Sequence, residues 1–156
     1  MTEQRVIPMI AYENGPAAMD WLGRAFGFRE RARVVENGRL THGEMELDGG
    51  VVMMATPSLN YHSPKRHREE CQTAERWHDV PYIIDGYLVY VDDIDAHHQR
   101  ALAAGAEIVS RLHDHLRDYR VYEALDLEGH RWRFLQWLRE VPQSERRRRP
   151  GEHDPR

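Results

Sequence analysis

The stretch from Tyr119 to Leu138 reads Tyr-Arg-Val-Tyr-Glu-Ala-Leu-Asp-Leu-Glu-Gly-His-Arg-Trp-Arg-Phe-Leu-Gln-Trp-Leu. Its two ends, 119–125 and 131–138, are rich in aromatic and aliphatic residues, and each predicts a strand. Gly129, between them, predicts a turn. Upstream, the pattern completes the unit with a strand, a helix and another strand, at 87–91, 94–104 and 107–110. The order is therefore strand, helix, strand, strand, strand.

The first part of the chain repeats this order. Pro16, at the start of its predicted helix, lies 11 positions before Gly27, and Ile94, at the start of the second helix, likewise lies 11 positions before Gly105. The other strands are predicted at 5–12, 29–36, 40–47 and 51–55. Their hairpin turns carry residues that tolerate a positive φ, Asn37-Gly38 and Asp48-Gly49-Gly50. The sequence therefore predicts an α+β fold of two βαβββ modules.

Four segments follow from this repeat. They are a first module at 1–56, an insertion at 57–85, a second module at 86–139 and an Arg-rich tail at 140–156. The insertion is polar and is interpreted as either a linker or a lid. The tail lacks apolar periodicity, and we expect it to be disordered and without a catalytic role.

Composition limits the class of protein. A net charge of −4 and a pI near 6.2 argue against a nucleic-acid partner. Cys71 is the single cysteine, so an internal disulfide and a Cys-rich zinc site are excluded. The N-terminus lacks an apolar signal region, and no apolar run approaches the roughly 20 residues of a membrane-spanning helix. We expect a cytoplasmic protein with no membrane partner.

Several short motifs resemble one family. In the second half these are segments 90–95, 103–106 and 126–132, with Arg120 six residues before Asp126. In the first half they are 18–28, 41–44 and 48–50. Together they resemble the vicinal-oxygen-chelate superfamily of glyoxalases, bleomycin-resistance proteins and dioxygenases, and in particular its PhnB-like branch. The resemblance implies a curved mixed sheet around a cup that holds a small ligand, and a homodimer.

The resemblance also makes a metal site testable from the sequence. It places the four usual ligand positions at Ile7, about Met53, about Gly86 and Arg133. None of these is a typical ligand of a divalent ion, and the Arg133 guanidinium would repel one. His97 and His98 diverge on a helix, and His62, His67, His78, His113 and His115 are assigned to polar loops. We therefore predict no metal and no other cofactor.

Two residues are candidate catalytic groups. His42 and Glu44 alternate along a predicted strand with Glu46, so the three share one face. An imidazole beside a carboxylate can act as a general acid and base. The alternative interpretation is a solvated strand face.

Six residues are candidate ligand-binding groups. Tyr90 could stack on a ligand or be a core tyrosine, and Arg133 beside Trp137 could receive a carboxylate or a planar ring, or form an internal ion pair. Arg120 could point into the cup or tie the turn at Asp126. Met53 could line the pocket, and Trp77 could close it from the insertion or pack in a dimer interface.

The favoured function is a metal-independent protein that binds a small aromatic or anionic compound, for sequestration or resistance. The alternative is an enzyme of the same superfamily, a lyase, isomerase or dioxygenase, that either depends on a metal or uses Glu44 or His42 as the general base. A purely structural, dimeric module also stays open, because fold alone does not give function.

Overall fold

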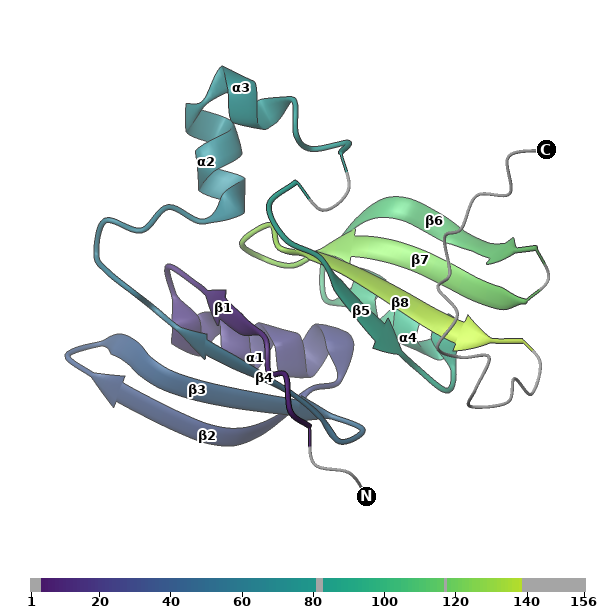
Figure 1. The fold of residues 1–156 in the computed structure, drawn as a ribbon, viewed down its shortest axis with the longest axis horizontal. Helices are drawn as coiled ribbons and strands as arrows, with labels where there is room; N and C mark the ends of the chain where they lie inside the picture. Colours follow the sequence, from purple (N-terminus) through teal and green to yellow (C-terminus); the bar gives the residue numbers. More distant parts are fainter. Residues whose placement is uncertain (1–3, 81–82, 117, 139–156) are drawn as a thin grey trace.

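The structure is a computed structural model that describes residues 4–80, 83–116 and 118–138 (Figure 1). The first module contains five elements: β1 (Met9–Ala11), α1 (Gly15–Phe26), β2 (Arg29–Glu36), β3 (Arg39–Leu47) and β4 (Gly50–Ala55). The second contains β5 (Tyr87–Tyr90), α4 (Ile94–Ala103), β6 (Glu107–His115), β7 (Tyr119–Leu125) and β8 (Arg131–Trp137). Two short helices, α2 (Pro64–Glu70) and α3 (Gln72–Glu75), lie in the insertion.

The two modules have the same topology. Each forms an open four-stranded mixed sheet, with the strand orders β1-β4-β3-β2 and β5-β8-β7-β6. The first strand of each module runs parallel to the last, and the other pairs are antiparallel. The predicted α+β fold of two βαβββ modules is therefore confirmed.

The residues that cap the helices are also equivalent in the two modules. The side chain of Asn14 accepts a hydrogen bond from the N–H of Ala17, and Asp93 does the same for Ala96 in α4. After each helix, a glycine takes a left-handed conformation, with φ of 79° at Gly27 and 82° at Gly105. These caps explain why both helices begin and end at equivalent points of the repeat.

One hydrophobic core joins the modules. The rings of Phe26 and Phe28 pack on Trp132, at centroid distances of 5.7 and 5.4 Å, and Phe26 also packs on Phe134 at 4.7 Å. Helices α1 and α4 contact each other, and Figure 1 shows them behind the two sheets. The helix-side faces of both sheets are thus buried together, and Tyr119, Val121 and Leu135 form a second, smaller buried cluster on the opposite face of the second sheet.

Some predicted boundaries were wrong. The first strand is 9–11 rather than 5–12, and the insertion, for which a linker or a lid was predicted, contains two helices at 64–70 and 72–75. Strand β6 continues to His115, so His113 lies in a strand and not in a loop. Because β6 is a largely exposed edge strand with two register shifts, it lacks the apolar alternation that identifies a strand. The predicted tail lies outside the described residues.

The Asp-Leu-Glu-Gly turn fits tightly against the insertion, and this gives a first prediction. Gly129 has a φ of 88°, and a Cβ there would lie 2.8 Å from the backbone nitrogen of Lys65. Gly105 has a φ of 82° but open space around it. Gly105→Ala should cost about 1 kcal/mol from backbone strain alone, and Gly129→Ala roughly 2–4 kcal/mol. Urea unfolding of both variants checks this; equal losses would contradict the contact with Lys65.

Candidate functional site

The face of the second sheet that is turned away from α4 carries three of the predicted ligand-binding residues. Leu88 pairs with Arg133 and Tyr90 pairs with Leu135, so the alternation of the strands places Tyr90, Arg133 and Trp137 on one side. This is the side away from the buried Trp132 and Phe134. We call the surface formed by Tyr90, Tyr119, Arg133, Leu135 and Trp137 the aromatic face.

The rings of the aromatic face are ordered by contact with one another. Trp137 stacks on Tyr90 with a centroid distance of 6.2 Å and an interplanar angle of 14°, and it meets Tyr119 edge-on at 5.8 Å. Tyr90 is nevertheless 45% exposed. Tyr119 and Leu135 are only 7% and 0% exposed, so Tyr90 is the most open ring of this face, and its position suits stacking on a planar ligand.

Arginines flank a buried carboxylate at the same face. Glu123, 5% exposed, accepts from Arg131 Nε at 2.7 Å and lies 2.9 Å from Arg133 Nε. The predicted alternative of an internal ion pair is therefore present, and it fixes the Arg133 guanidinium in place. The Glu123 carboxylate thus holds two guanidinium groups at this face.

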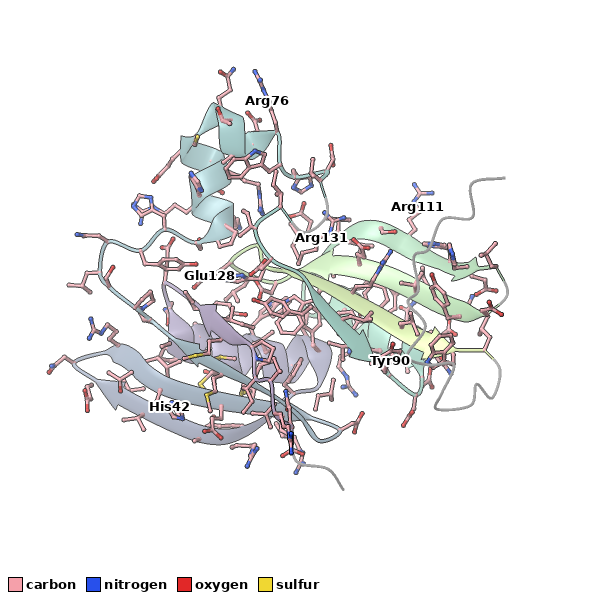
Figure 2. The ribbon with its side chains drawn as sticks, viewed as in Figure 1. His42, Arg76, Tyr90, Arg111, Glu128 and Arg131 are labelled. Atoms are coloured by element: carbon pink, nitrogen blue, oxygen red, sulfur yellow. The ribbon has the colours of Figure 1, made fainter. Side chains whose placement is uncertain are left out.

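The candidate catalytic residues lie on the outward face of the first sheet. The distance from His42 Nε2 to Glu44 Oε1 is 3.0 Å, and Arg31 Nε lies 4.0 Å from Glu44. Met53 pairs with Glu44 and shares its face. Figure 2 shows His42 on the first sheet and Tyr90 on the second. The chain thus brings His42 to Glu44 and Tyr90 to Trp137, but the two groups occupy different sheets.

Arg120 and Trp77 lie outside both the aromatic face and the His42–Glu44 group. The Arg120 guanidinium pairs with Asp95 at 2.9 Å and Asp114 at 3.2 Å, so the suggestion that it ties the turn at Asp126 was wrong. The neighbouring Val121 pairs with Leu135, which places Arg120 on the helix side of the sheet. Trp77 lines a small hollow together with Arg131, beyond one end of the aromatic face.

A buried polar network was not predicted, and it is centred on Asp126. One carboxylate oxygen accepts from the Tyr12 hydroxyl at 2.7 Å and the Trp132 indole N–H at 3.0 Å. The other accepts from the backbone N–H groups of Glu128 and His130, both at 3.0 Å. Asp126 is 5% exposed, so all four hydrogen bonds are shielded from water. The turn of the second module is thereby fixed to the end of β1.

His130 extends this network. Its Nδ1 lies 2.5 Å from the Asp85 carboxylate and its Nε2 lies 2.9 Å from the Ala11 carbonyl, two groups that can only accept. Both ring nitrogens therefore donate, which requires the imidazolium form. Burial opposes this charge, but the hydrogen bond to Asp85 and the charges of Asp126 and Asp85 outweigh it and raise the pKa of His130.

Glu128 joins the same turn to α1. Its two carboxylate oxygens accept from the backbone N–H groups of Glu13 and Asn14, at 2.7 and 2.8 Å, and Figure 2 shows it between the modules. The backbone carbonyl of Glu128 also accepts from the N–H of Lys65 at the start of α2. The motif 126–132 therefore acts as an internal clamp between the modules. A motif match could locate these residues, but it could not indicate their partners.

Comparison with known proteins identifies the family to which this fold belongs. Residues 7–134 match the Glyoxalase/Bleomycin resistance protein/Dioxygenase superfamily. The chain belongs to that superfamily. Uncharacterized protein Rv0887c of Mycobacterium tuberculosis is 32% identical to it over 144 residues, which cover 92% of this chain and 80% of the relative.

Solved glyoxalase-superfamily structures share the fold. TioX from Micromonospora sp. ML1 is 31% identical, with a TM-score of 0.64, and the match covers 89% of this chain and all of that one. FosX from Listeria monocytogenes, a fosfomycin resistance protein, is 10% identical with a TM-score of 0.60, covering 94% of this chain and 99% of that one. The similarity to FosX, at this low identity, shows a shared fold and nothing about function.

The four positions that the family resemblance assigns to metal ligands are Ile7, about Met53, about Gly86 and Arg133, and their residues do not fit an ion. Met53 in β4 pairs with Met9, and Arg133 in β8 pairs with Leu88. Thioether, alkyl and guanidinium groups are not donors for a divalent ion that chelates oxygen. Within 4–80, 83–116 and 118–138, no group of three His, Cys, Asp or Glu side chains could hold a metal. Nor does a helix of these segments have the length and apolar character to span a bilayer.

Proposed function

We propose that this protein binds a small aromatic or anionic organic compound on the aromatic face, without a metal, and that it serves in sequestration or resistance. The observation that carries the proposal is the Tyr90–Trp137 stack beside Arg133. A planar ring can extend the stack while its carboxylate meets the guanidinium. The bleomycin-resistance members named in the superfamily description agree with such a role.

The proposal also covers the oligomeric state of the protein, its cellular location and its branch of the superfamily. We propose a cytoplasmic homodimer of the PhnB-like branch, in which a second copy covers the open faces and completes the cup. The exposure of Leu88 and Tyr90, at 44% and 45%, supports a covered state. Light scattering should give twice the chain mass of 18.4 kDa. In this proposal, the insertion 57–85 is a lid whose Trp77 lies beyond the Arg131 end of the face.

Binding of 2-naphthoate, measured by isothermal titration calorimetry, tests the ligand class and gives the second prediction. Arg133→Gln should weaken binding at least roughly tenfold, because it removes a charge-assisted hydrogen bond. Arg111→Gln is the matched control: it removes an exposed arginine from β6. Addition of EDTA should leave binding unchanged. Loss of binding in EDTA, or equal affinities of the two variants, would contradict the proposal.

The enzyme alternative has one observation in its favour, the 3.0 Å contact between His42 and Glu44. Such a pair could move a proton on a ligand that the partner copy holds against the first sheet. Glu44→Gln separates the two functions, since it should abolish turnover if Glu44 is the base. The same variant should leave naphthoate affinity unchanged if the protein only binds.

A further inference from the structure

A groove lies between the two modules, where the start of β4 faces β5. Its volume is about 440 Å³, which is in the range of small-molecule sites. Phe28, Val52 and Trp132 line it and are less than 10% exposed, whereas Leu88 and Tyr90 are half-exposed. The groove therefore has a buried apolar side and an open edge that borders the aromatic face.

The polar groups of the groove differ from those of the aromatic face. The Gln4 amide donates to the Val51 carbonyl at 3.0 Å and accepts from the Val51 N–H at 2.6 Å, so the backbone already uses it. Among the described residues, the charged side chain that lines the groove is Asp48. Its carboxylate makes no hydrogen bond or ion pair to another described residue. Its charge is thus available to a ligand.

The surroundings of Asp48 strengthen its negative field. Asp48 also lines an adjoining hollow of about 200 Å³ together with Asp92, Asp93 and Arg100. Three carboxylates and one guanidinium thus line the hollow, and one of the carboxylates, Asp93, already accepts the cap hydrogen bond of α4. The excess negative charge lies at the end of an apolar groove. This arrangement complements an ammonium group on an apolar body and repels a carboxylate.

We propose that the groove is a second ligand site, which takes an organic cation with a flat apolar body. The body packs against Phe28, Val52 and Tyr87, and the ammonium group donates to the Asp48 carboxylate. This site goes beyond the proposed function, because it is a groove between the modules and selects the opposite charge. Tyr90 lies at its open edge and is shared with the aromatic face, whereas Arg133 and Trp137 do not line it.

A pair of probes with one ring system and opposite charges tests the site. With the full-length protein, calorimetry should show that 2-naphthylmethylamine binds in the groove and that Asp48→Asn weakens it roughly tenfold, as expected for loss of one charge-assisted contact. The same variant should leave 2-naphthoate affinity unchanged. Asparagine is the suitable replacement, because it tolerates the φ of 47° at this turn.

Two controls make the outcome decisive. Asp79→Asn removes an exposed carboxylate of the insertion and should leave the amine affinity unchanged. Arg133→Gln should weaken naphthoate only. The proposal is overturned if the amine does not bind, if Asp48→Asn and Asp79→Asn bind it equally, or if Arg133→Gln weakens the amine as much as it weakens naphthoate. A second copy of the chain that fills the groove would produce the first of these results.

Discussion

Asp126→Ala is expected to lower the free energy of unfolding by about 3–5 kcal/mol, because it leaves four buried donors without their acceptor. These are the Tyr12 hydroxyl, the Trp132 indole and the backbone N–H groups of Glu128 and His130. Each unsatisfied donor costs about 1–3 kcal/mol, and partial rehydration of the turn keeps the total below their sum. Urea unfolding followed by far-UV circular dichroism measures the loss.

Two further variants separate the effect of the lost hydrogen bonds on stability from the effect of the lost charge. Asp126→Asn keeps the size of the side chain but replaces one acceptor oxygen with a donor, so it should recover only part of the stability. Asp79→Asn changes the same charge at an exposed site and should lie within about 0.5 kcal/mol of the parent protein. If Asp126→Ala lost less than about 1 kcal/mol, the clamp between the modules would not exist in solution.

This clamp marks the boundary of what the sequence could predict. The strands and helices were found because their signals are local: glycines with positive φ at 27, 38, 49, 105 and 129 end helices or form turns. The hydrogen bond from Tyr12 to Asp126 joins residues 114 apart. No periodicity encodes such a contact, so the motif was recognised as a pattern while its physical role stayed hidden.

The candidate site, too, could be predicted only in part from the sequence. Strand alternation predicted that Arg133 and Trp137 share a face, and placed Tyr90 on the cup side with Leu88. The register of β5 against β8 places Leu88, Tyr90, Arg133 and Leu135 on one side of the sheet, and that this side is the cup stays a prediction. Whether Tyr90 and Arg133 bind a ligand stays a prediction. The partners of Arg120 could not be found from its motif, because Asp95 and Asp114 lie on a helix and an edge strand.

The groove at Asp48 had no signal in the sequence at all. Its walls come from different modules, so its existence depends on how α1 and α4 pack rather than on any one segment. Asp48 itself was assigned only as a hairpin residue. A turn residue with a left-handed backbone can therefore also place a charge at the seam between modules.

Stability should fall in mild acid because of His97, the second link between the modules. Its ring is 7% exposed, its Nε2 donates to the Phe26 carbonyl at 3.0 Å, and its Nδ1 accepts from the Tyr122 hydroxyl at 2.7 Å. This arrangement needs the neutral ring. Burial, reinforced by the charges of Arg100 and His98, outweighs the Phe26 hydrogen bond and lowers the pKa of His97 to about 4.

The direction of the pH dependence follows from the two states. Below about pH 6.5, His97 is protonated in the unfolded chain. In the folded protein it stays neutral until the pH falls to about 4. Stability is therefore fully present above pH 6.5 and falls by about 3 kcal/mol as the pH drops to 4. His130 has the opposite shift, so its contribution is present at low pH and is lost as the pH rises above 6.5 through its raised pKa.

Urea unfolding at pH values between 4 and 9 should thus give a maximum of stability between the two titrations. His97→Gln should flatten the acid side selectively, because it removes the proton uptake of the unfolded chain at that position. His98→Gln, which changes the adjacent and partly exposed ring on α4, should retain most of the acid slope, because burial is the larger cause of the lowered pKa of His97. If the two variants kept equal slopes between pH 6.5 and 4, His97 would not be neutral in the folded protein, and its bridge from α4 to the end of α1 would have to be charged.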